Sequence, residues 1–173
     1  MQPRDIAPHE ILLPVKPAFI VFTLIAALIV NMLPWSGWLL AIKPDFVALV
    51  MLYWCIQQPR KVGFTAACLM GLMMDVADGS LFGQHALAYS VLAFAGIVLH
   101  RRVLMFTMRD QILHVIPLLL LNDLIVLAIR KIAGTEFPGF SYFVGSFIAG
   151  ALWPVICFLL KLPQRLAPDP DDV

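Results

Sequence analysis

The residue types that could do chemistry are concentrated in one segment, residues 71–87, which has the sequence GLMMDVADGSLFGQHAL. It places two carboxylates, Asp75 and Asp78, and one histidine, His85, in a strongly apolar region. With Ser80 these are the residue types of a Ser/His/Asp triad. The local GSLFG pattern is not a nucleophile elbow, however, and closeness in sequence does not define a triad. The sequence therefore predicts no catalytic residue.

The cysteines and histidines also lack the spacing of a metal site. The three cysteines are isolated, and each lies within an apolar run, as is typical of small buried side chains: Cys55, Cys68 and Cys157. The four histidines do not form an HExxH pattern. We predict that the chain has no metal, no cofactor and no enzymatic activity.

The composition indicates what surrounds these acids. Hydrophobic residues make up 61% of the chain and charged residues 13%, whereas about a quarter of a soluble domain is charged. The formal net charge of +1 gives no reason to expect binding to nucleic acid. The chain is therefore predicted to be an integral membrane protein.

Apolar runs define the expected elements, because a helix needs roughly 20 residues to cross a hydrocarbon core about 30 Å thick. Six such segments predict an all-α membrane protein with about six transmembrane helices: residues 18–42, 46–56, 62–74, 79–99, 112–129 and 137–160. The second and third are short for a span. They are expected to be tilted, or joined as a helical hairpin near the inner face.

Basic residues predict the orientation, since short cytoplasmic loops are enriched in Lys and Arg. With the N-terminus inside, nine of them lie on the cytoplasmic side: Arg4, Lys16, Arg60, Lys61, Arg101, Arg102, Arg109, Lys161 and Arg165. Three lie outside: Lys43, Arg130 and Lys131. Both termini are therefore predicted to be cytoplasmic. The first apolar segment is too long for a signal-peptide core and is expected to be retained.

This topology predicts a single membrane domain between two short polar ends. The expected parts are a Pro-rich cytoplasmic leader at residues 1–17, a six-helix membrane domain at 18–161 and a disordered cytoplasmic tail at 162–173.

A series of small residues explains how Asp75 could be tolerated. Residues of this series recur at every fourth position and share one helix face: Gly63, Ala67, Gly71, Asp75 and Gly79. Small residues at this spacing allow close helix approach, which we expect at Gly71 and Gly79. Asp75 is expected to hold the helix end against a neighbour by accepting hydrogen bonds, rather than to carry a mobile proton. The alternative is that Asp75 and Asp78 cap the turn into Gly83 and are solvated from outside.

Other residues are candidates for interaction or packing. Pro44 and Asp45 suit the first turn of the second helix, where proline needs no hydrogen-bond partner and an acid is favoured by the helix dipole. The topology places Trp54 and Trp153 toward the inner boundary. Trp153 with Pro154 is either a partner-binding element or a kinked packing contact.

Three motifs in order carry a resemblance to a known family. The first is KPDFVALVMLYWCIQQPRKVG, and the last is AGALWPVICFLLK. Between them lies G-x3-D-x3-G-S-x2-G, formed by Gly71, Asp75, Gly79, Ser80 and Gly83. Over about residues 31–161 the chain resembles the MreD family of bacterial rod shape-determining proteins.

The resemblance implies a function that composition alone does not. MreD-like proteins are inner-membrane scaffold subunits of the elongation complex, which inserts peptidoglycan along the side wall of rod-shaped cells. It implies direct binding to MreC, action with MreB, RodA and an elongation penicillin-binding protein, contact with lipid, and no enzymatic activity. The resemblance does not determine whether the protein forms a homodimer. The family is also similar in fold to the substrate-binding subunits of energy-coupling-factor transporters, which suggests a cavity toward the outside.

A permease, or a solute- or lipid-binding subunit of a transporter, is the alternative function. In that case Asp75, Asp78, Asn122 and Asp123 would line a polar pocket, whereas in a scaffold Asn122 and Asp123 would serve as buried hydrogen-bonding groups. Transporters usually place convergent polar groups at broken helices near the midplane. Here the acidic cluster is expected near a helix end, which favours the scaffold.

Overall fold

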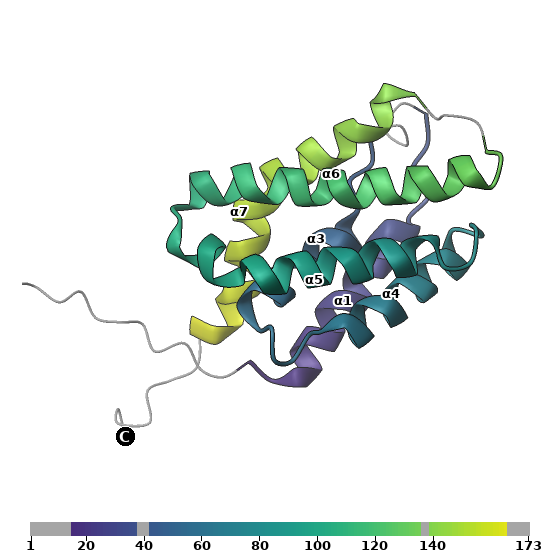
Figure 1. Cartoon of the computed structure of the whole chain (residues 1–173). Coiled ribbons are helices and arrows are strands. Elements are labelled where there is room, and N and C mark those ends of the chain that lie inside the picture. Colours follow the sequence, from purple (N-terminus) through teal and green to yellow (C-terminus); the bar gives the residue numbers. More distant parts are fainter. Residues whose placement is uncertain (1–14, 38–41, 136–138, 166–173) are drawn as a thin grey trace, which may run out of the picture.

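The computed structural model describes residues 15–37, 42–135 and 139–165. These ranges contain six α-helices, one 3-10 helix and no strand, so the predicted all-α membrane fold with six helices is confirmed (Figure 1). Most of the predicted leader and tail lies outside the described residues. The elements are α1 (Pro17–Met32), α3 (Phe46–Gln57), α4 (Phe64–Ala77), α5 (Gln84–Met105), α6 (Met108–Ile132), η1 (Phe140–Phe143) and α7 (Val144–Arg165).

The helices fall into a long and a short group. Three segments are long and apolar enough to cross a membrane, namely α5, α6 and the run Phe140–Gln164, which joins η1 to α7. The other three, α1, α3 and α4, are shorter apolar helices. The structure therefore has the composition of a membrane protein, with half of its helices shorter than a full span.

Helix α3 forms the centre of the fold. Every residue from Val47 to Ile56 is buried, and α3 packs against α1, α5 and α7. A helix enclosed on every side by other helices needs apolar side chains all round, which explains why so short a segment is so hydrophobic. The other helices surround it (Figure 1).

Several predicted boundaries differ from those of the helices, and backbone geometry gives the reason for two of them. The fourth helix was expected to begin at Gly79, but it begins at Gln84, because Gly79 and Gly83 have φ values of 58° and 99° that form a left-handed turn. The first helix ends at Met32 instead of continuing to residue 42, two residues before Pro34, which disfavours helical backbone in the residue before it.

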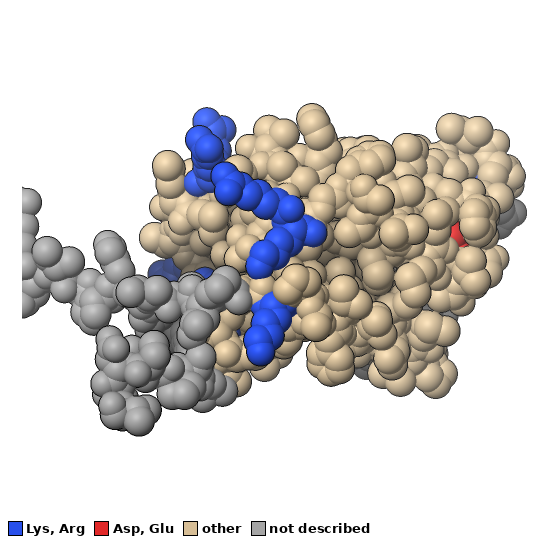
Figure 2. Space-filling view, turned by 90° about the horizontal axis from the view of Figure 1, so that it is seen from below, with Lys and Arg blue, Asp and Glu red and all other residues tan. Residues whose placement is uncertain are grey.

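The two ends of the molecule differ in charge. The start of α1, the α3–α4 loop, the α5–α6 loop and the end of α7 lie toward the same end (Figure 1). Seen from below, Lys and Arg side chains gather toward this end, while a carboxylate is visible near the opposite one (Figure 2). The α4–α5 turn, with its acidic residues, lies at that opposite end (Figure 1).

Candidate functional site

Asp75 is buried at the end of α4 and caps the start of α5. Its Oδ1 accepts hydrogen bonds from the backbone N–H of His85 at 2.9 Å and from His85 Nδ1 at 2.8 Å. Its Oδ2 accepts from the backbone N–H of Gly83 at 2.7 Å, and Ser80 Oγ lies 3.4 Å from Oδ1. The first N–H groups of a helix lack partners and attract negative charge. Asp75 is 1% exposed, so this capping interaction is what keeps an acid inside an apolar segment.

Gly71 and Gly79 have different roles, although both lie in the predicted small-residue face. A Cβ at Gly71 would clash with the Cα of Ala86 and stand 2.5 Å from its N, so α4 and α5 meet backbone to backbone here. A Cβ at Gly79 would meet none of the described residues within 4 Å. The expected close approach at Gly79 is therefore wrong; this glycine, like Gly83, provides the positive φ of the turn.

Asp45 organises a second polar cluster at the start of α3. It is the N-cap residue and accepts from the Ala48 N–H at 3.0 Å. Asn31 Nδ2 donates to its Oδ1 at 3.0 Å, and the Tyr89 hydroxyl donates to its Oδ2 at 2.7 Å. The sequence placed Pro44 and Asp45 in the first helical turn, but the helix begins after them. Sequence reasoning missed Asn31 and Tyr89, although an asparagine in a charge-free apolar segment was an available signal.

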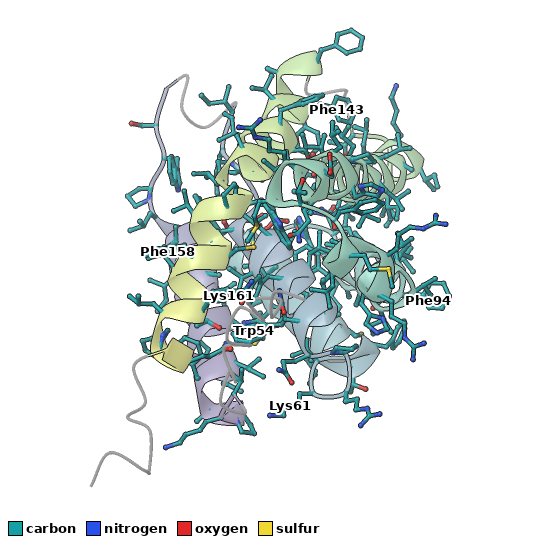
Figure 3. The ribbon with its side chains drawn as sticks, turned by 90° about the vertical axis from the view of Figure 1, so that its left-hand side faces the viewer. Trp54, Lys61, Phe94, Phe143, Phe158 and Lys161 are labelled. Atoms are coloured by element: carbon teal, nitrogen blue, oxygen red, sulfur yellow. The ribbon has the colours of Figure 1, made fainter. Side chains whose placement is uncertain are left out.

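Trp54 and Trp153 are fully buried core residues. Trp54 Nε1 donates to Thr23 Oγ1 at 2.9 Å, and Trp153 Nε1 donates to Gln111 Oε1 at 3.1 Å. Figure 3 shows Trp54 among the helices, while the labelled Phe94 and Phe158 lie on opposite sides of the molecule. Trp153 lies next to Pro154 within α7. Of the two roles considered for this pair, its burial favours a packing contact inside the protein over a partner-binding element.

A polar cavity of about 140 Å³ opens at the end of the molecule that contains the α4–α5 turn. Residues from α1, α4, α5, α6, η1, α7 and the segments before α3 and after α4 line it: Asn31, Lys43, Asp45, Met74, Asp78, His85, Asn122, Asp123, Arg130, Tyr142, Gly145 and Ser146. Asp123 accepts a hydrogen bond from Ser146 Oγ, so it both joins α6 to α7 and lines the cavity. Asp75 is not among the lining residues, because it faces the start of α5.

A sequence model of the family described as rod shape-determining protein MreD matches residues 15–162, which is most of the chain. The chain belongs to the MreD family. It is 29% identical over 145 residues to the rod shape-determining protein MreD of Haemophilus influenzae, covering 82% of this chain and 87% of that protein. No solved structure matches it, so the similarity in fold to the transporter subunits stays a prediction.

Two of the three motifs that suggested the MreD family include a polar cluster, and the third lies within α7. The first motif covers α3 and the loop after it, with Asp45 as the cap of this helix. The second forms the α4–α5 junction, where Gly71 provides the close contact and Asp75 the cap. In the described residues, no group of three His, Cys, Asp or Glu side chains could hold a metal ion. The first two motifs thus contain the caps of α3 and α5.

Proposed function

We propose that this chain, whose family membership gives it a role in rod shape determination, acts as a non-enzymatic scaffold of the cell-wall elongation complex. In this proposal it binds the membrane-spanning helix of MreC and helps to control side-wall peptidoglycan synthesis with MreB, RodA and an elongation penicillin-binding protein. The observation that carries the proposal is an apolar groove between α1 and α4.

The groove has a volume of about 400 Å³ and an almost entirely apolar lining. Its residues come from α1, α4 and the turn after α4: Leu28, Met32, Leu72, Met73, Val76, Ala77 and Phe82. It exists because α1 packs mainly against α3, and α4 mainly against α5, so that α1 and α4 meet over only a small area. Exposed apolar residues alone would fit lipid equally well. A concave surface with flexible methionines, backed by a rigid junction, favours a partner helix.

Filling the groove should prevent partner binding. We expect Val76→Trp to lower the amount of MreC that copurifies per folded protein by about fivefold or more, because the indole ring would occupy the space of the partner helix. Val76 is 68% exposed, so the larger ring does not disturb the core. The measurement is the ratio of MreC to folded protein after affinity purification.

The matched control is Val98→Trp on α5, where the valine is 61% exposed and lies outside the groove. It should leave the MreC ratio within about twofold of the parent, since a tryptophan facing lipid is tolerated. Equal losses in both variants would contradict the assignment of the groove.

We further propose that the basic end of the molecule faces the cytoplasm. The positive-inside tendency supports this orientation, and the loops containing Arg60–Lys61 and Arg101–Arg109 are then available to a cytoplasmic partner or to anionic lipid. In this arrangement the polar cavity and the α4–α5 turn face outward, and both termini are cytoplasmic.

Cysteine labelling tests this orientation in the full chain. After Cys55, Cys68 and Cys157 are replaced by alanine, Thr135→Cys should react with a membrane-impermeant maleimide in intact spheroplasts. Arg60→Cys should react only after permeabilisation. Both side chains are exposed, so a lack of reaction reports the membrane barrier rather than burial. The reverse pattern would place the basic end outside.

A further inference from the structure

We propose that the polar cavity binds a small zwitterion, a molecule that carries one ammonium group and one carboxylate. This site is separate from the α1–α4 groove, because the two share no lining residue. The proposal rests on three observations: an unpaired buried acceptor, charged groups of both signs without mutual ion pairs, and the cavity's size.

Asn122 provides the unpaired acceptor. It is among the residues that line the cavity and is 2% exposed, and within the described part of the chain its Oδ1 has no hydrogen-bond partner. Buried polar atoms are nearly always paired, because an unmade hydrogen bond is costly in a medium that excludes water. The neighbouring Asp123, in contrast, accepts from Ser146. An occupant that donates an N–H to Asn122 Oδ1 would satisfy this atom.

The cavity also contains charged groups of both signs. Lys43 Nζ donates to the backbone oxygen of Asn31 at 2.5 Å, and Arg130 Nε donates to Gln84 Oε1 at 3.4 Å. Each of these cations therefore has further donors to offer. Within the described part of the chain, neither forms a salt bridge with the cavity acids Asp78 and Asp123.

The acceptors and donors together define the class of ligand. An ammonium group suits Asn122 Oδ1 and the carboxylates, and a carboxylate suits the cationic donors of Lys43 and Arg130. A ligand with only one of these charges would leave the opposite set of cavity groups unsatisfied. Asp45 is already satisfied by Ala48, Asn31 and Tyr89, so it is not needed for binding.

The size of the cavity limits the ligand. A cavity of about 150 Å³ can hold one molecule the size of benzene, and this cavity has a volume of about 140 Å³. Glycine, alanine and serine fall within this range and carry both required charges. They are therefore the appropriate probes.

The test uses the full chain, purified in detergent without MreC, so that its outcome is independent of the proposed scaffold function. Thermal unfolding is followed by tryptophan fluorescence with each amino acid, and with sodium acetate or methylammonium chloride as half-ligands at the same ionic strength. We expect a saturable rise in the unfolding midpoint of about 3 °C or more with at least one amino acid. The half-ligands should give less than about a third of this rise.

Variants separate binding from general stabilisation by solutes, which acts equally on all of them. Arg130→Gln should weaken the apparent affinity by about tenfold or more, whereas Lys131→Gln, one residue away and outside the cavity lining, should leave it unchanged. Asn122→Leu, which removes the unpaired acceptor, should abolish the ligand-dependent rise.

Two results would overturn the proposal. One is that none of the three amino acids exceeds the half-ligands. The other is that the rise persists in both Arg130→Gln and Asn122→Leu. Either result would mean that the cavity holds only water.

Discussion

Gly71→Ala should remove most of the folded protein, although it adds a single methyl group. The new Cβ would clash with the Cα of Ala86 and lie 2.5 Å from its backbone N and 2.6 Å from the backbone carbon of His85. All three are backbone atoms, so no side-chain rotation can relieve the overlap, and α5 would have to move away from α4. That movement would also separate Asp75 from the N–H groups it caps. Gly71→Leu, with a larger side chain, should be at least as harmful.

The measurement for Gly71 is the yield of monodisperse protein and its unfolding midpoint in detergent. Gly63→Ala is the control on the same small-residue face. A Cβ at Gly63 would meet nothing within 4 Å among the described residues, so this change should cost only about 1 kcal/mol, the typical cost of placing alanine at a helix N-cap. If Gly71→Ala folded as well as Gly63→Ala, α4 and α5 could not lie as close as the structure places them.

Asp75→Leu is expected to have the second largest effect. It would leave the backbone N–H groups of Gly83 and His85 without their acceptor at a buried site. Each unpaired group costs about 1–3 kcal/mol, so the total for the two groups should be about 2–6 kcal/mol of unfolding free energy. Because the turn after α4 forms one side of the groove, MreC binding per folded protein should fall as well.

Asp75→Asn tests whether the cap needs two accepting oxygens or only one, because an asparagine side chain has a single oxygen. An amide can still accept a hydrogen bond through its oxygen. In the structure both carboxylate oxygens accept backbone N–H groups, so an amide must direct its NH₂ at one of them. The asparagine variant should therefore be intermediate between the parent and Asp75→Leu in unfolding midpoint.

Asp78→Asn is the matched control for the asparagine variant. Asp78 lies one turn from Asp75 and is exposed, so its replacement should leave the midpoint close to that of the parent. If Asp75→Asn were as damaging as Asp75→Leu, the negative charge itself would be essential. A parental midpoint for all three variants would contradict the capping role of Asp75.

The sequence alone determined the class of the protein and the number of its helices. Apolar runs and scarce charges are local properties, and a helix satisfies its own backbone groups within the bilayer, so length and composition were sufficient. The turn at Gly79 and Gly83 was not located in this way, because the fourth helix was expected to begin at Gly79. The family motifs were recognisable because they are short segments of the chain.

Only the tertiary structure decided what the polar residues contact. Gly71 and Gly79 belong to the same series of small residues at every fourth position. In the structure, however, Gly71 touches the backbone of α5, whereas Gly79 forms part of a left-handed turn. Asp45 joins α1, α3 and α5 through residues far apart in the chain. The cavity likewise gathers residues from most of the elements. These arrangements depend on how helices pack against one another, and no periodicity within a single helix specifies its neighbour.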